Sequence, residues 1–381
     1  MRVLLDAHML GHRETGNESY VRELLWAFAE AGKRNVTAML SAESSTDEPP
    51  LPAAIGLRRF ASPSNVWRLA VGLRQACREH AATILHVSYN GPVSVAAPLV
   101  VSVHDVSFRR HPEFFSPRLR LQFATVQRYS LWRADAVITT SEWSRQDLLT
   151  FYPFLRDRVF VTPLAASPRY RRYGEPEVAA FLQRCGIDRP YILYVGLLEP
   201  RKNIHRLLSA YAVLAEHCAD PPVLVLAGKS ARCDRDTARD LAAMEQRGFV
   251  RVLGYIPLEE LPLLYNGAML FVFPSFYEGF GLPVVEAMAC GTPVVASNRT
   301  AIPELAGNAA LLVDPGNVAE LAVAMERLVA SAALRRELGH AGLERAAGFS
   351  WRRTAELTWQ AYEETVNRWN HPAQSKRFRW Q

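Results

Sequence analysis

Short uninterrupted apolar runs alternate with longer amphipathic stretches along almost the whole chain. LVVSV (99–103), VLVLA (223–227) and LFVF (270–273) are such runs, and none has the polar–apolar alternation of a sheet with one wet face. Parallel sheets are covered by helices on both faces, so their strands are apolar throughout. The pattern therefore predicts an α/β fold with parallel sheets.

The apolar runs and the amphipathic stretches give the expected elements. The strands expected are Val3–Asp6, Val36–Leu40, Ile84–Val87, Leu99–His104, Ala136–Thr140, Tyr191–Val195, Pro222–Ala227, Val250–Leu253, Met269–Phe273, Pro293–Ala296 and Ala310–Val313. The helices expected between them include Glu18–Ala31, Pro117–Arg133, Ile204–His217, Pro283–Cys290 and Val318–Ala330.

The alternation stops between about Pro163 and Pro190. The stretch PLAASPRYRRYGEPEV (163–178) is rich in proline and charge and has no helical or strand period. Such a segment is typical of a linker. We therefore predict two parallel α/β domains of similar size, the first over residues 1–168.

A glycine-rich bend separates two acids, Glu278 and Glu286, in FYEGFGLPVVEAMACGTPVV (276–295). Gly279 and Gly281 follow an expected strand and precede an expected helix, at the edge where open α/β sheets bind ligands. Glycine lets the backbone approach a ligand closely, and a helix start offers unpaired N–H groups to an anion. The bend favours a phosphate site with a carboxylate beside it for sugar hydroxyls. A tight turn with two incidental acids is the alternative.

A second segment, YILYVGLLEPRKNIHRLLSAY (191–211), repeats this design. An expected strand is followed by Gly196, a short loop, and then Arg201 and Lys202 at the start of a helix. Arginine offers phosphate a planar fork and lysine a compact charge. Adjacent cations at a helix N-terminus are unfavourable unless an anion is bound there. The pair thus indicates an anion site, and the alternative is a solvated basic pair.

Cysteine usage and hydropathy indicate a cytoplasmic protein. The five cysteines are odd in number and form no C-x-x-C pair, as in a reducing compartment. The apolar run at the N-terminus is too short for a signal peptide, and no window approaches 18 uninterrupted apolar residues. A nicotinamide-dependent oxidoreductase is excluded because no G-x-G-x-x-G follows the first strand.

The formal net charge of +6 is unevenly distributed. Residues 51–170 carry 15 basic and 7 acidic side chains, or +8, whereas residues 171–381 carry 24 and 23, or +1. Either the basic part is a solvated face, or it attracts phosphorylated substrates or an acidic membrane surface. We expect no nucleic-acid partner, because the arginines are not organised around a reading motif.

Metal-ligand patterns are weak in this sequence. Asp234 and Asp236 form a lone Asp-x-Asp in a charged helical stretch, and we expect no metal there. His8 and His12 are four residues apart but flank a loop. We expect no zinc site at this histidine pair and leave a substrate contact open.

Several of these segments resemble the retaining glycosyltransferases of family 4, which have the two-domain GT-B fold. In the second half, GLLEPRKN (196–203), LGYIPLEELPLLYNGA (253–268) and EGFGLPVVEAMACGTPVVAS (278–297), with its E-x7-E spacing, carry the resemblance. In the first half, HRETGNESYVREL (12–24), VVSVHDVSF (100–108) and VITTSEWSRQDL (137–148) carry it. The resemblance implies two Rossmann-like domains facing across a cleft. The first, residues 1–168, would bind the acceptor, and the second, residues 169–354, would bind the nucleotide sugar. The helix at about 355–381 would pack back on the first domain.

The resemblance also implies roles for single residues. Arg201 and Lys202 would hold the diphosphate of a nucleotide-sugar donor, and Glu286 would bind its ribose. His104 would come from the first domain towards the reacting centre and orient the donor sugar. The other residues expected at the donor are Gly16, Gly196, Glu278, Gly279, Phe280, Gly281, Leu282 and the stretch from Tyr255 to Leu261, which would border the nucleobase. The loop at Gly16 departs from the family pattern by reading Thr-Gly-Asn-Glu, so acceptor contacts at Asn17 and Glu18 do not carry over.

These roles predict a retaining, metal-independent hexosyltransferase without a cofactor. Its donor would be GDP-mannose or UDP-glucose, and its acceptor a hydroxyl of a glycan or of a lipid-linked glycan. A nucleotide-sugar epimerase or phosphorylase on the same plan, or a non-catalytic sugar-binding protein, are the alternatives. FSPRLRLQFATVQRYSLWR (115–133) is either a membrane-surface helix or an amphipathic helix packed on the sheet. We expect KRFRWQ (376–381) to be an auxiliary membrane contact.

Overall fold

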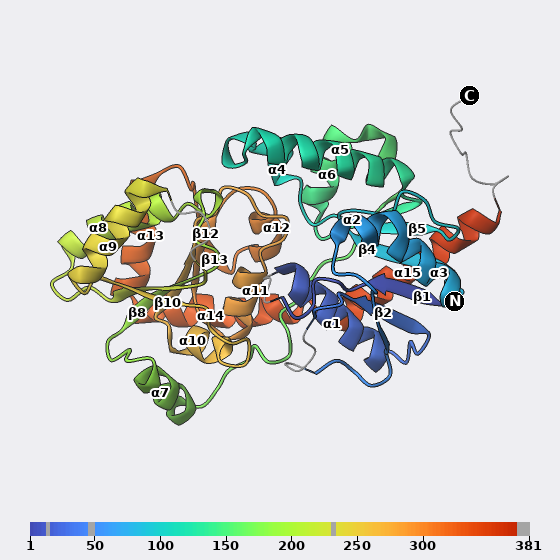
Figure 1. The fold of residues 1–381 in the computed structure, drawn as a ribbon. Helices are drawn as coiled ribbons and strands as arrows, with labels where there is room; N and C mark the ends of the chain where they lie inside the picture. The colour runs from blue at the N-terminus through green and yellow to red at the C-terminus, as the bar shows by residue number, and fades with distance from the viewer. Residues whose placement is uncertain (13–15, 45–49, 230–233, 372–381) are drawn as a thin grey trace. The chain divides into compact units, whose positions relative to one another are not determined.

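The computed structural model describes residues 1–12, 16–44, 50–229 and 234–371 (Figure 1). The chain divides into two compact units. The first unit comprises Met1–Leu164 together with the segment that begins at Ser350, and the second comprises Ala165–Phe349. The chain therefore leaves the first unit, builds the second and returns. The boundaries predicted from the sequence were after residues 168 and 354.

The sheet of the first unit has seven parallel strands within the described ranges, in the order β3-β2-β1-β4-β5-β6-β7. They are β1 (Val3–Asp6), β2 (Val36–Leu40), β3 (Gly56–Arg59), β4 (Ile84–Ser88), β5 (Leu99–Ser102), β6 (Ala136–Thr139) and β7 (Val159–Val161). On β1, Leu4 pairs with Thr37 on one side and Leu85 on the other. Leu4, Leu85 and Val101 are fully buried in one core, as expected for strands covered on both faces.

Helices cover this sheet, and several begin at a serine whose hydroxyl caps the first turn. The described helices of eight or more residues are α1 (Gly16–Glu30), α5 (Pro117–Arg133), α6 (Glu142–Phe151) and α15 (Trp351–Asn370). The shorter ones are α2 (Asn65–Trp67), α3 (Leu73–Glu79) and α4 (Ser107–Arg110), with a π-helical turn at Arg68–Gly72 and 3₁₀ turns at Pro112–Phe114 and Pro153–Leu155. Ser116, Ser141 and Ser350 each accept a hydrogen bond from a first-turn amide of α5, α6 and α15. Helix α15 packs against α1, where Trp359 meets Phe28 edge to face at 5.7 Å.

The second unit has a six-stranded parallel sheet within the described ranges, in the order β10-β9-β8-β11-β12-β13. Its strands are β8 (Tyr191–Val195), β9 (Val223–Ala227), β10 (Val250–Gly254), β11 (Leu270–Phe273), β12 (Val294–Ser297) and β13 (Ala310–Val313). Its helices are α7 (Glu175–Arg184), α8 (Ile204–His217), α9 (Arg235–Gln246), α10 (Leu261–Gly267), α11 (Leu282–Ala289), α12 (Ile302–Ala306), α13 (Val318–Ala330) and α14 (Ala332–Ala347), with a 3₁₀ turn at Pro200–Lys202.

The prediction of two parallel-sheet α/β domains is confirmed. The strands that the sequence did not predict, β3 and β7, are edge strands. Strand β3 reads GLRR with exposed arginines, and β7 is three half-buried residues long, so neither is a long apolar run. The expected strand Leu99–His104 ends at Ser102, which places His104 in the loop that follows. No helix of the described ranges is both long enough and apolar enough to cross a bilayer.

Candidate functional site

The strand order of the second sheet reverses between β8 and β11, which lie side by side at its centre. The loops that leave their carboxyl ends, 196–203 and 274–281, therefore start at the topological switch point, the usual ligand site of such sheets. The two loops are joined by a backbone hydrogen bond of 3.0 Å from Phe276 N to Arg201 O. Both loops lie in the segments that the sequence indicated as candidate anion sites.

Glycine is required at the bend before α11. Gly281, the N-cap residue of α11, has a φ of 108°, and a Cβ there would lie 2.5 Å from Cδ1 of Ile302. Pro283 occupies the first turn of α11, where its missing N–H leaves no helical bond unmade. Because Gly281 has no side chain, the helix start carries no side-chain cap that would have to be displaced by an anion.

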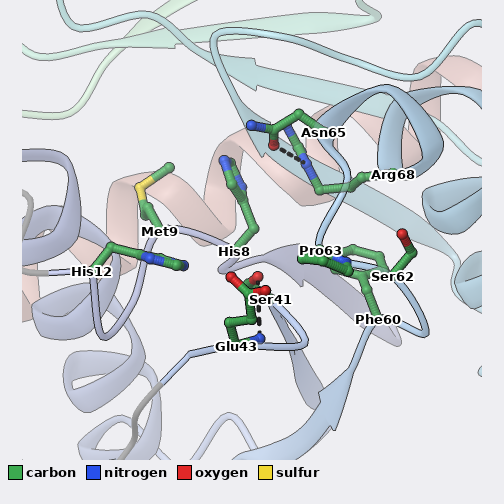
Figure 2. Close-up of a pocket in the computed structure, with 10 residues that line it drawn as sticks. All are labelled: His8, Met9, His12, Ser41, Glu43, Phe60, Ser62, Pro63, Asn65 and Arg68. Atoms are coloured by element: carbon green, nitrogen blue, oxygen red, sulfur yellow. Dashed lines mark hydrogen bonds between the residues drawn. The ribbon is translucent and has the colours of Figure 1, made fainter.

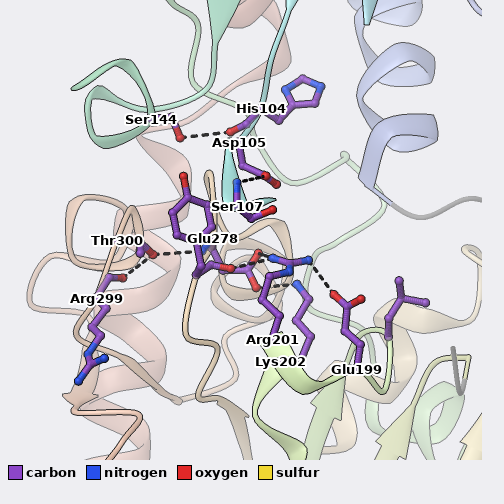
Figure 3. Close-up of polar contacts among 12 residues, drawn as sticks. His104, Asp105, Ser107, Ser144, Glu199, Arg201, Lys202, Glu278, Arg299 and Thr300 are labelled. Atoms are coloured by element: carbon purple, nitrogen blue, oxygen red, sulfur yellow. Dashed lines mark hydrogen bonds and ion pairs between the residues drawn. The ribbon is translucent and has the colours of Figure 1, made fainter. Parts of the chain in front are cut away.

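The two cations of the first loop are held by carboxylates (Figure 3). Lys202 Nζ lies 2.5 Å from Oε1 of Glu278, and Arg201 Nη1 lies 3.8 Å from Oε2 of the same side chain. Arg201 Nη2 also donates to Glu199 Oε1 at 2.8 Å. Two cations thus face two carboxylates, and Glu278 is buried. The basic pair is therefore preorganised and internally compensated, which differs from the free anion site that the sequence suggested.

Three neighbouring residues hold this cluster in place. Asn203 is buried with a left-handed φ of 64°, and its amide donates to Pro274 O at 3.1 Å and to Pro315 O at 2.7 Å. Thr300 Oγ1 accepts from the backbone N–H of Glu278 at 3.1 Å. The ammonium of Lys202 lies 5.2 Å from the ring centre of Phe273, a cation–π contact. The cluster is consequently fixed by both neighbouring loops.

Burial shifts the pKa values of the ionisable groups in the cluster. It lowers the pKa of Lys202, with a further decrease from Arg201, while Glu278 opposes the shift. Burial also raises the pKa of Tyr194, and the nearby Glu278 and Glu199 add to that increase. An added anion nearby would favour the ammonium form of Lys202.

Glu286 belongs to a second hydrogen-bonded group. Tyr265 donates its hydroxyl to Glu286 Oε2 at 3.1 Å, and Tyr170 also hydrogen-bonds with this carboxylate. The rings of Tyr170 and Tyr265 meet edge to face at 5.8 Å. Burial, followed by the charge of Glu286, raises the pKa of both tyrosines. They therefore remain donors that orient the carboxylate.

The other residues expected around the donor lie at the same edge of the second sheet or near it. Tyr255 follows β10 and is exposed, with Lys229 Nζ 5.7 Å from its ring centre. Leu261 begins α10 and is buried, and Leu282 begins α11. Phe280 is buried against Phe349, with ring centres 5.8 Å apart. Gly279 lies between Glu278 and Phe280 in the bend, and Gly196 follows β8 with a φ of 152°.

His104 and Gly16 lie in the first unit. His104 follows β5, and both of its ring nitrogens are buried without a hydrogen-bond partner among the described residues. Burial lowers the pKa of His104 to about 4, against the opposing charge of Asp105, so the imidazole is neutral near pH 7. Two buried, unpartnered ring nitrogens are a reason to expect a ligand. Gly16 begins α1, and a Cβ built on it would meet no described atom within 4 Å.

A buried polar chain positions the ring beside His104. Ser102 Oγ lies 3.0 Å from the hydroxyl of Tyr20 and 2.6 Å from Nε2 of His86. His86 Nδ1 lies 2.5 Å from the hydroxyl of Tyr362 on α15. Tyr20 packs edge to face on His104 with ring centres 4.4 Å apart. The segment after residue 350 thus supports the His104 loop of its own unit.

The Asp-x-Asp pair has a structural explanation. Asp234 is the N-cap of α9, and its carboxylate accepts from the backbone N–H of Thr237 at 2.9 Å. Asp236 is exposed and pairs with Arg239 at 3.4 Å. Among the residues that the structure describes, no group of three or more His, Cys, Asp or Glu could hold a metal ion.

Sequence reasoning missed the residues that support the site. Glu199 lies two residues before Arg201, separated from it by Pro200, and could have been noticed from its position. Asn203 carries a weaker signal, since asparagine tolerates the left-handed conformation. Thr300 and Tyr170 come from distant elements and have no local motif. Tyr265 lies in the resembling segment 253–268, but no feature of that segment indicated a contact with Glu286.

Two family models match the chain. Residues 183–345 match the model described as Glycosyl transferases group 1, and residues 15–170 match Glycosyltransferase Family 4. Both matches bear out the resemblance.

Similar curated proteins and solved structures agree with these matches. O-antigen chain mannosyltransferase B of Escherichia coli is 36% identical over 69% of this chain and 70% of its own length. Serotype-specific mannosyltransferase WbdA of Escherichia coli is 32% identical over 60% of this chain, which spans only 29% of that longer protein. The structure of sucrose-phosphate synthase from Thermosynechococcus elongatus has a TM-score of 0.77 at 22% identity, covering 96% of this chain and 98% of the other. That likeness shows the GT-B fold alone.

Proposed function

The chain belongs to the family 4, group 1 glycosyltransferases, and we propose that it transfers a hexose from a nucleoside-diphosphate sugar to a glycan hydroxyl with retention of configuration. The observation that carries the donor assignment is the cluster of Arg201, Lys202 and Glu278 at the switch point of the second sheet. The mannosyltransferase names of the relatives favour mannose, so GDP-mannose is the preferred donor and UDP-glucose the alternative.

The chemistry needs positive charge where the leaving group departs. When the bond between the anomeric carbon and the phosphate oxygen breaks, its electron pair passes to the nucleoside diphosphate. Arg201, Lys202 and the start of α11 would stabilise that charge, as preorganised donors do. Glu278 orients Lys202 and faces the donor sugar, and the neutral His104 would hydrogen-bond to that sugar. The acceptor hydroxyl attacks from the leaving-group side, and its proton passes to a phosphate oxygen of the donor.

This proposal is tested with GDP-mannose and UDP-glucose, each with and without a short mannose oligosaccharide as acceptor. We expect nucleoside diphosphate to be released from one donor in an acceptor-dependent reaction, and NMR to show an α-linked first product from the α-linked donor. EDTA should leave the rate unchanged, because Arg201 and Lys202 would supply the positive charge that a metal supplies in other transferases. A β-linked product would exclude retention. Activity lost in EDTA and restored by magnesium or manganese would contradict metal independence, and conversion of donor alone would favour an epimerase.

The two tyrosines beside Glu286 give a prediction about the ribose. Tyr265→Phe removes a hydroxyl donated to the carboxylate at 3.1 Å, so Glu286 should be less well oriented. We expect the Kd for the nucleoside diphosphate to rise only about 3- to 10-fold, roughly 0.5–1.5 kcal/mol, because Tyr170 still hydrogen-bonds with the carboxylate. Calorimetry with the ribonucleotide and its 2′-deoxy and 3′-deoxy forms measures this. The variant should discriminate between them less than the parent does. Unchanged discrimination would contradict the ribose role of Glu286, and Tyr211→Phe, whose hydroxyl bonds to Pro222 O, is the matched control.

We propose that α5 contacts an anionic membrane surface. Within α5 only Gln127, Ser130 and Leu131 are buried, although the helix is 17 residues long. Leu121 and Trp132 are 67% and 51% exposed. Basic residues flank them: Arg118, Arg120 and Arg128 are exposed, and Arg133 is half-buried. Exposed apolar side chains among arginines fit the boundary between lipid headgroups and acyl chains. The second membrane segment expected from the sequence, 376–381, lies outside the described residues.

Vesicle sedimentation tests this contact. Each basic residue near an anionic surface contributes about 1 kcal/mol, so Arg118→Ala with Arg120→Ala should weaken binding to phosphatidylglycerol vesicles about 30-fold. Trp132→Ala should weaken it as well, whereas Val323→Ala, an exposed apolar residue of the second unit, should not. Equal binding to neutral phosphatidylcholine vesicles, or unchanged binding of the arginine variant, would contradict the proposal.

A further inference from the structure

The imidazole of His104 contacts the rings of two tyrosines of its own unit. Tyr20 on α1 meets it edge to face with ring centres 4.4 Å apart. Tyr89, which directly follows β4, meets it edge to face at 5.8 Å. Neither ring nitrogen of His104 has a hydrogen-bond partner among the described residues. The direction of this imidazole is therefore set by ring contacts, since no described hydrogen bond fixes it.

The backbone of Tyr89 is strained. Its φ is 60°, in the left-handed region that a bulky side chain rarely adopts. Tyr89 N donates to the carbonyl of Ser102 on β5 at 2.8 Å, and the next amide, that of Asn90, donates to Ser88 O at 2.7 Å. Glycine or asparagine would adopt this conformation with less strain, but neither supplies a ring. Because strained residues cluster at functional sites, the strain points to a use for the ring of Tyr89.

Tyr20 is held in another way, by a buried polar chain. Its hydroxyl bonds to Ser102, Ser102 bonds to His86, and His86 bonds to Tyr362 of α15. Burial, together with the nearby His104, lowers the pKa of His86 to about 3, so the His86 ring is neutral. A neutral imidazole can accept from one hydroxyl and donate to another, so all three bonds can form together. The ring of Tyr20 is consequently anchored through its hydroxyl.

The buried carboxylate of Asp6, at the end of β1, lies near this chain but is compensated. Its charge would favour the protonated form of His86. Arg68 donates to Oδ2 of Asp6, and His8 lies 3.0 Å from Oδ1. Arg68 is itself held by Asn65, through the hydrogen bond drawn in Figure 2. Burial therefore prevails over the charge of Asp6, and His86 stays neutral.

We propose that Tyr20 and Tyr89 are positioning residues that fix the imidazole of His104 for its contact with the donor sugar. This rests on the proposed function, in which His104 hydrogen-bonds to that sugar. The two rings, which we call the tyrosine clamp, restrict the rotation of the imidazole and keep water from its nitrogens. The carbonyl of His104 is fixed as well, by the hydroxyl of Ser144 at 3.1 Å (Figure 3). Neither tyrosine needs to touch the sugar in this role.

A double-substitution cycle measures whether the tyrosines act through His104. Tyr20→Leu and Tyr89→Leu each remove a ring, and each should lower the transfer rate at saturating donor about 10- to 100-fold, as expected for a misplaced contact group. In the background of His104→Ala the same substitutions should change the rate less than about 2-fold, since no imidazole is left to misplace. Tyr89→Phe keeps the ring and should stay within about 3-fold of the parent rate.

Tyr89→Asn separates the effect of the ring from that of the backbone. Asparagine tolerates the left-handed conformation, so this variant should fold and yet lose as much rate as Tyr89→Leu. Ala81→Gly is the matched control, because Ala81 also has a left-handed φ, of 44°, and is exposed after α3. It relieves backbone strain outside the clamp and should leave the transfer rate unchanged. The midpoint of thermal unfolding checks the fold of every variant.

NMR of the histidine rings in the free chain tests the clamp without turnover, with the signals of His104 assigned by their absence in His104→Ala. The titratable groups around this ring are Asp105, His86 and the two tyrosines. Burial holds the pKa of His104 at about 4 against the charge of Asp105, so the parent ring should not titrate near the ordinary value of 6.5. Loss of either tyrosine ring admits water, and the pKa should rise towards 6.5 in Tyr20→Leu and Tyr89→Leu.

Three results would overturn the clamp. They are equal fold losses of rate with and without His104, a Tyr89→Asn variant that keeps the parent rate, and an unchanged titration of His104 in both leucine variants. Any of these in a chain that transfers hexose removes the clamp and leaves the proposed function. A parent that turns over no nucleotide sugar removes the proposed transfer, and the NMR titration then decides on the clamp alone. The titration also decides if the rate of His104→Ala is too low to measure.

Discussion

Replacing Lys202 with alanine is expected to lower the rate of glycosyl transfer about 100- to 1000-fold, the usual loss when one preorganised charge-stabilising group is removed. The ammonium of Lys202 is placed by Glu278 at 2.5 Å and by the ring of Phe273. It needs no reorganisation when negative charge develops on the leaving diphosphate. Arg201 remains in the variant, so some activity should persist. Initial rates at saturating donor and acceptor measure the effect.

Binding experiments separate the two ways in which this variant could fail. Lys202→Ala removes one cation, but it also leaves Glu278 with a more distant partner, Arg201, at 3.8 Å. The double variant with Glu278→Gln removes that carboxylate charge as well. If Lys202 holds the diphosphate, calorimetry should show weak nucleoside-diphosphate binding in both variants and normal nucleoside binding. Full recovery in the double variant would mean that repulsion by Glu278 caused the loss. Lys33→Ala, which alters a lysine stacked on Trp359 of the first unit, is the control.

The pH dependence of nucleoside-diphosphate affinity gives an independent test of the role of Lys202. Burial and Arg201 hold the pKa of Lys202 below its ordinary value of 10.5. The ammonium form is complete below this lowered pKa and is lost as the pH rises through it. Diphosphate affinity should therefore fall on the alkaline side at a pH below 10.5. Lys202→Arg should abolish that fall, because a guanidinium does not deprotonate in this range. A fall that persists in Lys202→Arg would come from another group.

The sequence predicted most of the sheets because buried parallel strands are apolar on both faces. LVVSV and VLVLA lie in β5 and β9, at central positions of their sheets. An edge strand is covered less and needs no such run, which is why β3 and β7 escaped prediction. Edge position alone does not prevent prediction, because β10 and β13, the edge strands of the second sheet, were predicted from their mainly apolar runs VRVL and ALLV.

The sequence predicted the separate loops of the candidate donor site but not the contacts between them. Lys202 and Glu278 were each selected by their own loop, but their contact joins residues 76 positions apart. The contact forms because β8 and β11 are neighbours in the sheet. No local sequence motif predicts the order of strands in a sheet. The hydrogen bond from Tyr265 to Glu286 also could not be predicted, because it joins two helices, α10 and α11, whose packing no local motif specifies. The ligand roles of these residues stay predictions.

The largest effect on stability is expected at Gly228, in the loop after β9. Its φ is 143°, and a Cβ there would lie 2.0 Å from the carbonyl oxygen of Gly196. The obstructing atom belongs to the backbone, and the loops around it are tied together: Gly228 N donates to Gly254 O at 2.7 Å, and Gly196 N donates to Ala227 O at 2.9 Å. Alanine at this position must therefore push apart the loops that follow adjacent strands.

Gly228→Ala should consequently lower the unfolding free energy of the second unit by more than about 4 kcal/mol, a loss typical of severe steric conflicts. Gly248→Ala is the matched control, because Gly248 also has a positive φ, of 74°, but a Cβ there meets no described atom within 4 Å. That variant should lose only about 1–2 kcal/mol of unfolding free energy, the cost of holding alanine in a left-handed backbone conformation. Urea unfolding followed by circular dichroism compares the two. Because the displaced Gly196 starts the loop that carries Arg201 and Lys202, any folded Gly228→Ala protein should also bind nucleoside diphosphate poorly. Equal losses of stability in the two variants would show that the close approach of the loops does not constrain position 228, and that backbone conformation alone requires glycine there.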